Sequence, residues 1–315
     1  MSVIIYLLCI IYLYTKSQLH LKIMKKSKKL CDITVIIITY NEGNHLKRCI
    51  DSLKKYVQNI FILDSYSTDK TVNIIKSKKI KFKSKQFKNH SDQFNSAIKL
   101  SQAKTKWLMR IDADEYVEKK FFEKLNKKLS QIDSNVNGIN ITRRYFFNQK
   151  EIRYGGVFPQ KKLRIWKNGK GFCEKTFFDE EIICKPKIIN LDLSIFDNNK
   201  NTFESWKKKH RIYAVKEAIR FKLEKNLNNK NLSNEQRKIK IINKNIYYRF
   251  PIFLRAIFLF FYRYFFNLGF KDGVNGLKFC FWHTLWFRLL VDLNIFKIFL
   301  IYKNKKDTIE NILKD

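Results

Sequence analysis

The stretch ITVIIITYNE, residues 33–42, decides the fold class of this chain. Its first seven residues form a continuous run of β-branched side chains, which is typical of a strand buried on both faces of a parallel sheet. Polar residues 40–42 then end the run, and apolar side chains recur at helical spacing over residues 46–53. A strand, a polar turn and a helix in this order begin an α/β unit.

The same order repeats along the next seventy residues. We expect further strands at residues 59–63, 80–82 and 107–111, a helix that carries Val72 and Ile75, and another helix from about Ser91. This βαβα alternation predicts an α/β fold with an open, mostly parallel sheet and helices on both of its faces.

Polar clusters follow three of these strands, at residues 39–42, 64–69 and 112–115. Any one cluster is typical of turn formers and helix caps. Ligands of open α/β sheets, however, bind at the carboxyl ends of the strands. Three clusters at successive strand ends therefore favour a ligand site at that edge.

Asp112 and Asp114 lie one residue apart in the third cluster. Two such carboxylates can present oxygens to Mg²⁺ or Mn²⁺, which takes its further ligands from water and a diphosphate. A metal placed there neutralises the charge that develops on a departing phosphate. The chain has no GxxxxGK[ST] loop and no GxGxxG after the first strand, which disfavours a P-loop ATPase and a dinucleotide oxidoreductase.

The chain resembles the family 2 glycosyltransferases in four runs that occur in the family's order: residues 35–42, 64–71, 91–95 and 112–115. The subgroup it most resembles adds glucose or a similar sugar to the lipopolysaccharide core, and the resemblance extends over residues 32–295. It implies a GT-A fold, an inverting transfer, a divalent metal (Mg²⁺ or Mn²⁺), and a nucleotide-sugar donor such as UDP-glucose. The acceptor would be a lipid-linked sugar, the lipopolysaccharide core or another surface glycan.

The resemblance also implies roles for individual residues. Thr39, Tyr40 and Glu42 would lie by the nucleoside, and Asp64 would accept hydrogen bonds from the base. The remaining donor contacts would come from Gln93, Asn95, Arg110 and Asp112, and the metal would be held by Asp112 and Asp114.

An inverting transfer needs a general base that takes the proton of the acceptor hydroxyl. Related enzymes carry a Val-His-Glu element after an Arg-Leu-Phe strand, and here residues 163–166 match the strand while residues 178–180 fall at the later position. The resemblance therefore makes Glu180 the base, with Asp179 in reserve. The chain departs from the family where Asp179 replaces its histidine, and Asp197 aligns loosely with a later one.

The composition divides the chain into four parts. Residues 1–23 are an apolar N-terminal segment, which is either a membrane anchor or lies before the true start of the protein. Residues 32–198 are the expected catalytic domain. Residues 199–245 are an exposed basic helix and a linker, and residues 246–302 are rich in aromatic side chains. In the last part Arg249, Arg255 and Arg263 fall within an arc of roughly 120° at helical pitch. We expect amphipathic helices on a membrane surface, with these arginines at the lipid headgroups.

Lysines directly after the N-terminal segment predict that the chain works at the cytoplasmic face of the inner membrane. The formal net charge of +36 fits an acidic partner, and it equally fits drift toward the residues of an AT-rich genome. Six cysteines without a CxxC pair disfavour a zinc site and a disulfide framework.

Two other functions stay open. A non-enzymatic basic protein bound to a membrane or nucleic acid would account for the charge but not for the strand-end motifs, and no nucleic-acid fold pattern is present, so no nucleic-acid partner is expected. A nucleotidyltransferase on a similar sheet would carry a Gly-rich, basic phosphate loop where this chain has residues 40–42.

Overall fold

The computed structural model describes residues 30–175, 180–225 and 247–304. Its first half alternates strands and helices as the sequence predicts. The elements are β1 (Cys31–Thr39), α2 (Leu46–Leu53), β2 (Val57–Asp64), α3 (Thr71–Ser77), β3 (Lys81–Ser84), α4 (His90–Ser101) and β4 (Trp107–Arg110). All four expected strands and the three helices that separate them are confirmed.

The second half of the sheet is mixed. It contains β5 (Glu115–Tyr116), β6 (Gly138–Phe147), β7 (Lys150–Ile152), β8 (Gln160–Lys167) and β11 (Ile188–Asp197), together with helix α5 (Lys119–Leu129). The order across the sheet is β3-β2-β1-β4-β8-β6-β11-β5, and β7 pairs with β6. Strands β9 (Gly171–Cys173) and β10 (Ile182–Cys184) form a separate antiparallel pair.

The strand directions bring several carboxyl ends to one edge of the sheet. Strands β1 to β4 are parallel, β8 is antiparallel to both β4 and β6, and β6 is parallel to β11. Strands β1, β2, β4, β6 and β11 therefore all end at the same edge, which we call the carboxyl edge. All three polar clusters lie there.

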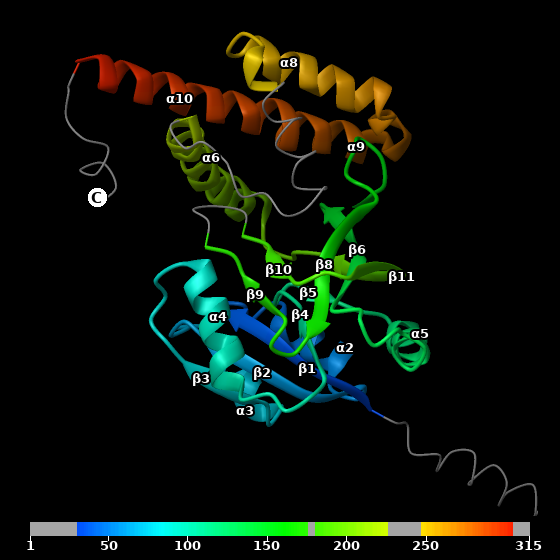
Figure 1. Cartoon of the computed structure of the whole chain (residues 1–315). Coiled ribbons are helices and arrows are strands. Elements are labelled where there is room, and N and C mark those ends of the chain that lie inside the picture. The colour runs from blue at the N-terminus through cyan, green and yellow to red at the C-terminus, as the bar shows by residue number, and fades with distance from the viewer. Residues whose placement is uncertain (1–29, 176–179, 226–246, 305–315) are drawn as a thin grey trace, which may run out of the picture.

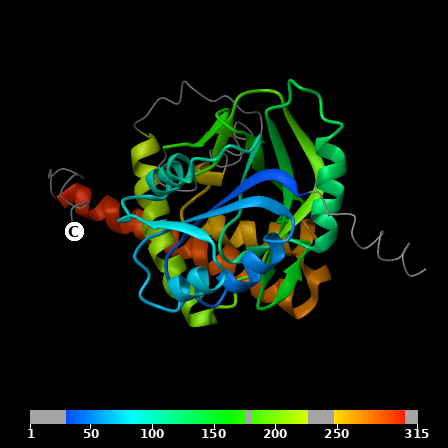
Figure 2. The same cartoon turned by 90° about the horizontal axis from the view of Figure 1, so that it is seen from below.

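The β-branched run of β1 is buried on both faces, as expected. Ile33, Val35 and Ile37 pack on one face with α2, α3 and α5, whereas Ile36 packs on the other face with Phe94 of α4. Figures 1 and 2 show α4 and α5 on opposite sides of the sheet. The apolar contacts on both faces fix the sheet and hence the positions of the loops at its carboxyl edge.

A layer of helices lies beyond the carboxyl edge (Figure 1). Its elements are α6 (Phe203–Lys225), α8 (Leu254–Phe261), the π-helix η1 (Tyr262–Phe266), the 3₁₀-helix η2 (Gly269–Asp272), α9 (Gly273–Phe279), the π-helix η3 (Cys280–Trp286) and α10 (Phe287–Asn304). The sequence predicted an exposed basic helix at α6, but one side of α6 is buried. Its Ala214 packs against Phe287 and Val291 at the start of α10.

The expected position of the arginines in this layer is wrong for two of the three. Arg255 is 4% exposed, and its Nε donates to Asp292 Oδ1 at 2.9 Å. Arg263 donates to the Gly155 carbonyl and to Thr284 Oγ1. Both side chains face the protein because acceptors distant in sequence meet them there. Among residues 30–175, 180–225 and 247–304, no helix has the length and hydropathy needed to cross a membrane.

Candidate functional site

The loops after β1 and β2 are joined into one structure. The Asn41 amide donates to Ser67 Oγ at 2.8 Å, and the Thr68 amide donates to Asn41 Oδ1 at 2.8 Å. The Gly43 amide donates to Asp69 Oδ2 at 2.9 Å. Asn41 has a positive φ of 54°, a conformation that asparagine tolerates better than most residues. The first two polar clusters thus lie side by side, as the parallel order of β1 and β2 requires.

Asp64 is buried and holds this structure together. Its carboxylate accepts from Thr39 Oγ1 at 2.9 Å, from the Ser67 amide at 2.8 Å and from Ser67 Oγ at 2.6 Å. These contacts position the turn after β2, and hydrogen bonding from Asp64 to a base stays a prediction. Tyr40, by contrast, is 60% exposed beside the turn and presents a free aromatic face to solvent.

Glu42 ties the β1 loop to the segment that follows β11. Its Oε2 lies 2.7 Å from His45 Nδ1, and His45 Nε2 accepts from the Lys200 amide at 2.8 Å. Because Nε2 accepts a hydrogen bond, the proton of the neutral imidazole is on Nδ1, which donates to Glu42. The buried His45 therefore connects the two halves of the sheet at the carboxyl edge.

Gln93 and Asn95 lie on α4, and their side chains form hydrogen bonds with neighbouring loops. Gln93 is buried, and its Nε2 donates to Ser65 Oγ at 2.9 Å. Asn95 forms two hydrogen bonds with the backbone of Cys173 in β9. Its Nδ2 donates to the Cys173 carbonyl at 2.7 Å, and its Oδ1 accepts from the Cys173 amide at 2.9 Å. Both carboxamides thus fix loops around the site, and direct contact with a donor stays a prediction for each.

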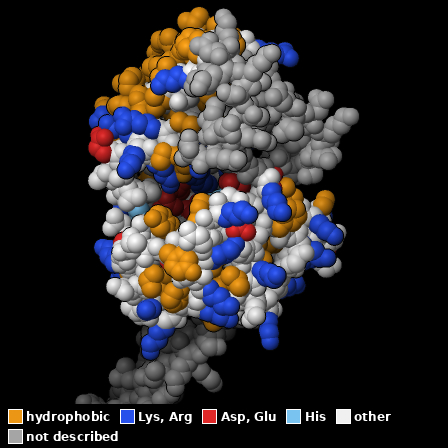
Figure 3. Space-filling view, turned by 90° about the vertical axis from the view of Figure 1, so that its left-hand side faces the viewer, with side chains coloured by type: hydrophobic (Ala, Val, Ile, Leu, Met, Phe, Trp, Pro, Cys, Tyr) orange, Lys and Arg blue, Asp and Glu red, His pale blue; other side chains and the backbone are white. Residues whose placement is uncertain are grey.

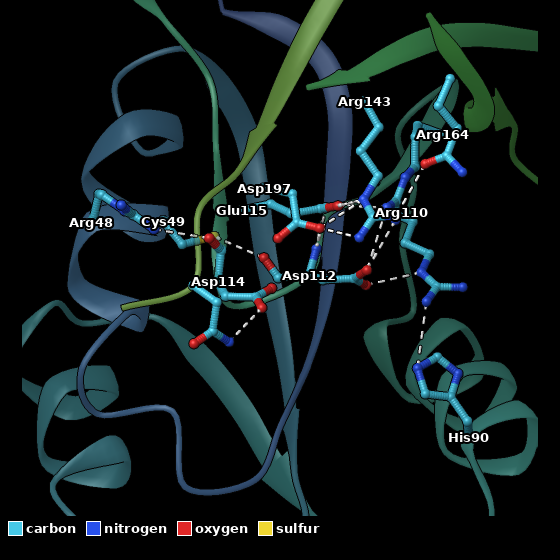
Figure 4. Close-up of polar contacts among 12 residues, drawn as sticks. Arg48, Cys49, His90, Arg110, Asp112, Asp114, Glu115, Arg143, Arg164 and Asp197 are labelled. Carbon is cyan, nitrogen blue, oxygen red and sulfur yellow. Dashed lines mark hydrogen bonds and ion pairs between the residues drawn. The ribbon is translucent and has the colours of Figure 1, made fainter. Parts of the chain in front are cut away.

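Asp112 lies between two arginines (Figure 4). Its Oδ1 accepts from Arg110 Nε at 3.0 Å, and its Oδ2 accepts from both terminal nitrogens of Arg164 at 3.3 Å. Burial raises the pKa of Asp112, but the charges of Arg110 and Arg164 outweigh burial and hold the pKa below its ordinary value. Asp112 is therefore an ionised carboxylate, and Arg110 points into the site rather than to solvent.

Further charged residues surround Asp112 and its two arginines. Glu115 is 1% exposed; its Oε2 accepts from the Asp112 amide at 2.8 Å and its Oε1 from Arg164 Nη2 at 2.6 Å. Arg143 Nε donates to Asp197 Oδ2 at 2.7 Å. Burial raises the pKa of Glu115 to about 8, against the charge of Arg164, and the nearby Asp112 and Asp197 add to the rise.

Sequence reasoning did not assign Arg143, Arg164 or Glu115 to the site. The available signal was an arginine next to apolar residues in each of two strands, Arg143 in β6 and Arg164 between Leu163 and Ile165 in β8, because a buried charge needs a partner. Asp197, which stands where the resemblance suggested a lost histidine, is the partner of Arg143. Its position at the end of β11 brings it to the carboxyl edge.

Asp114 accepts from fewer donors than Asp112, the other aspartate of the third cluster. Its side chain is half-buried, and its Oδ2 accepts from Asn199 Nδ2 at 3.0 Å. Arg48 Nη2 donates to the Asp114 carbonyl at 2.9 Å, which fixes the backbone. Among the described residues, only Asn199 donates to the Asp114 carboxylate, so Asp114 keeps an oxygen for a further partner.

These residues fit a metal ion whose coordination is completed by substrate phosphates and water. The described part of the chain contains no group of three or more His, Cys, Asp or Glu residues that could hold a metal ion. Both oxygens of Asp112 already accept from arginines, whereas one oxygen of Asp114 has no donor among the described residues; metal binding by each aspartate stays a prediction. Mg²⁺ and Mn²⁺ are commonly bound through one or two carboxylates, waters and substrate phosphates, and this donor set suits that arrangement.

Glu180 lies just before β10, in the β9–β10 hairpin whose residue Cys173 is hydrogen-bonded to Asn95. Burial raises the pKa of Cys173 to about 11; the Arg110 guanidinium opposes the rise, and the charge of Glu180 adds to it. The hairpin therefore borders the arginine pair, and Glu180 is partly exposed there. Asp179 lies outside the described residues. The role of Glu180 as the base stays a prediction.

A pocket of about 310 Å³ opens next to Asp114. The β6–β7 turn, the segment after β11 and the start of α6 line it with Tyr145, Phe146, Phe147, Asn148, Gln149, Asn199, Asn201, Phe203 and Trp206. Asn199 belongs both to this pocket and to the contact with Asp114. Figure 3 shows acidic side chains at the bottom of a hollow between the sheet and the helical layer.

Comparison with known proteins identifies the kind of domain that carries this site. Residues 34–178 match the family model described as glycosyl transferase family 2. The chain is 28% identical over 238 residues to the glycosyltransferase SunS of Bacillus subtilis, which covers 65% of this chain and 55% of that protein. It is 32% identical over 148 residues to the lipopolysaccharide core biosynthesis glycosyltransferase LpsC of Rhizobium meliloti, which covers 44% of this chain and 52% of that protein. The chain thus spans about half the length of these relatives.

Solved structures show a more distant likeness. One is the glucosyl-3-phosphoglycerate synthase of Mycobacterium tuberculosis in complex with Mn²⁺, UDP and glucosyl-3-phosphoglycerate, which aligns with a TM-score of 0.39 and 13% identity. The alignment covers 58% of this chain and 77% of that one. The parallel strands in the order β3-β2-β1-β4 confirm the open, mostly parallel α/β sheet that the sequence predicted, and the family match covers this part of the chain.

Proposed function

We propose that this chain, whose residues 34–178 match the model of glycosyl transferase family 2, transfers a sugar from a nucleotide-sugar donor to a glycan or glycolipid acceptor. The observation that carries the proposal is the meeting of three polar clusters at the carboxyl edge, where acidic side chains lie in the hollow between the sheet and the helical layer (Figure 3). The donor would lie over the joined loops of β1 and β2, with its diphosphate toward Asp114.

Asp114 would hold Mg²⁺ or Mn²⁺ together with the donor diphosphate. The metal supplies positive charge that stabilises the departing nucleoside diphosphate. Asp112 has a different task in this proposal, because its two arginines already neutralise it. It orients Arg110, whose guanidinium lies in the same network and can approach a phosphate oxygen.

Transfer requires one bond to form and one to break. The acceptor hydroxyl oxygen attacks the anomeric carbon, the bond from that carbon to the diphosphate oxygen breaks, and the hydroxyl proton goes to a carboxylate. Attack opposite to the leaving group inverts the anomeric configuration. Glu180 is our candidate for the proton acceptor because it is partly exposed in the hairpin that borders Arg110.

The pocket beside Asp114 supports a sugar as the acceptor. It combines aromatic walls (Phe146, Phe147, Phe203 and Trp206) with carboxamides (Asn148, Gln149, Asn199 and Asn201). Aromatic faces pack against the C–H faces of sugar rings, and carboxamides both donate to and accept from hydroxyl groups. A volume of about 310 Å³ is at the lower end of the range for small-molecule pockets and suits one or two sugar rings.

The place of action remains a proposal as well. We propose the cytoplasmic face of the inner membrane, where nucleotide sugars are available to an enzyme that modifies a membrane-linked glycan. The six lysines within residues 16–29, which follow the apolar run of residues 3–15, support this orientation, although these residues lie outside the described ones.

Binding of nucleotides tests the donor site. Purified protein is heated with a panel of nucleoside diphosphates and triphosphates, with and without Mn²⁺, and its melting temperature is measured. A ligand at 100 times its Kd adds about 2.7 kcal/mol to stability, so one nucleotide should raise the melting temperature by several degrees in the presence of metal. No shift with any nucleotide would overturn the donor site and favour a basic binding protein. A shift with nucleoside triphosphates alone would favour a nucleotidyltransferase.

A further inference from the structure

One helical stretch of the layer exposes an apolar stripe. Along α8 and η1, the exposed fractions are 49% for Leu254, 60% for Phe258, 48% for Phe261, 54% for Tyr262, 51% for Phe265 and 78% for Phe266. Their spacing of three, four, seven and eight residues places all six on one side of the helix. Soluble proteins rarely leave such a contiguous aromatic surface uncovered, so the stripe indicates a binding surface.

The stripe faces outward because the opposite side of the helix packs against the protein. Ala256 is fully buried on that opposite side, and the side chains of Arg255 and Arg263 turn into the protein; Arg255 is paired with Asp292, which is fully buried. The Asp292 carboxylate also accepts from the Phe253 amide at 2.9 Å, just before α8 begins. Turning the helix to bury its aromatic stripe would therefore expose a buried ion pair and break the contacts of Arg263. The outward orientation is built into the packing.

The charge around the stripe selects the partner. Within residues 247–300 the exposed charged side chains are all basic: Arg249, Lys271, Lys278 and Lys297. The two carboxylates of this segment are engaged within the protein, Asp292 with Arg255 and Asp272 with the amides of Arg153 and Tyr154. An aromatic surface beside basic side chains complements a layer of lipid tails beneath anionic headgroups. A second copy of this chain is a poorer partner, since it would bring two net charges of +36 together.

We propose that α8 and η1 dock this protein on the surface of an anionic lipid bilayer, with the aromatic stripe inserted among the headgroups. Figure 3 shows hydrophobic side chains gathered at the end of the molecule beyond the hollow that contains the acidic residues. Docking there places the bilayer next to the helical layer and leaves the hollow open at the side. A membrane-linked acceptor would then reach the site without leaving its bilayer.

Vesicle binding tests the proposal without any donor or catalytic turnover, so its failure leaves the proposed function standing. The full chain is floated with vesicles of phosphatidylcholine alone or with added phosphatidylglycerol. The test variant is Phe258→Asp with Phe265→Asp, and the matched control is Phe87→Asp, which replaces a phenylalanine that is 51% exposed in the segment before α4. Melting curves establish that each variant is folded.

We expect the wild-type chain and the control to bind the phosphatidylglycerol vesicles, and the double variant to bind at least tenfold more weakly. Raised salt should weaken binding of the wild-type chain because it screens the basic side chains. Equal binding by the double variant would overturn the proposal. A second result would also overturn it: a wild-type chain that does not bind vesicles and is a dimer, together with a double variant that is a monomer. The stripe would then join two copies.

Discussion

Asp112 and Asp114 are separated by one residue, yet their surroundings differ, and we propose different tasks for them. Asp112 is held between Arg110 and Arg164, whereas Asp114 contacts Asn199. A motif of two aspartates cannot by itself show this difference. It arises because Arg164 comes from β8, more than fifty residues later, and reaches the end of β4 only through sheet pairing.

Substitution of each aspartate should separate the two tasks. Asp112→Ala removes the carboxylate partner of Arg110 and one of the two carboxylate partners of Arg164, so we expect stability to fall by about 2–3 kcal/mol. Asp114→Asn keeps an oxygen for Asn199, so its stability should stay within about 0.5 kcal/mol of wild type. Urea unfolding measures both. A loss of stability in Asp114→Asn as large as in Asp112→Ala would contradict the assignment.

Glu180 is the residue whose proposed role depends most on chemistry. Glu180→Gln keeps the shape of the side chain and removes its basicity, so the rate of transfer should fall by about 10²–10⁴-fold while nucleotide binding is unchanged. The matched control is Glu181→Gln, its neighbour in the same hairpin, which pairs with Lys162. Comparable rates for Glu180→Gln and the control would move the base elsewhere.

At the scale of elements, the sequence predicted those parts that depend on local pattern. The β-branched run of β1 and the apolar spacing of α2 arise from residues close in the chain, and both elements form where expected. The orientation of α8 could not be predicted in this way. Helical spacing correctly put Arg255 on one side of α8, but only the position of Asp292, 37 residues away, shows that this side faces the protein.

The buried ion pair of α8 should therefore dominate the stability of the helical layer. Arg255 and Asp292 are 4% and 0% exposed, and Asp292→Ala would leave the arginine charge buried without its partner. We expect a loss of about 3–5 kcal/mol, measured as a lower melting temperature. The exposed pair of Lys47 and Asp51 is the control, because Asp51→Ala should change stability by less than about 1 kcal/mol. Equal effects would show that the α8 pair is not buried in solution.

Two histidines should make the same layer sensitive to acid. Burial lowers the pKa of His210 to about 4, helped by the charge of Lys209, and burial with the charge of Arg263 lowers the pKa of His283 well below its ordinary value. A histidine that is kept neutral in the folded state takes up a proton more readily when the chain unfolds. Its contribution is therefore complete above pH 6.5 and is lost as the pH falls toward 4.

The melting temperature measured between pH 7 and 4 tests this expectation. The wild-type value should fall more steeply below pH 6.5 than that of His283→Phe, which keeps a ring stacked near Phe279 but cannot be protonated. His20→Phe, outside the described residues, is a control for a histidine without an assigned contact. Parallel curves for wild type and His283→Phe would contradict the buried, neutral state of His283.

At the scale of the whole molecule, a sheet and a helical layer enclose the candidate site between them (Figures 1 and 3). The sheet side was predictable, since the carboxyl ends of parallel strands must meet at one edge. The side that we propose for the acceptor was not, because its pocket is assembled from the β6–β7 turn, the segment after β11 and the start of α6. No short motif marks residues that come together from three separate segments.

The most direct test of the central claim is transfer itself. The purified chain is incubated with Mn²⁺, a panel of radiolabelled nucleotide sugars that includes UDP-glucose, and a membrane extract as the source of acceptors. We predict that label from one donor enters the lipid or glycan fraction, that chelation of the metal stops it, and that Asp114→Asn lowers the rate at least about 100-fold. An absence of transfer from every donor, or an undiminished rate in Asp114→Asn, would contradict the account.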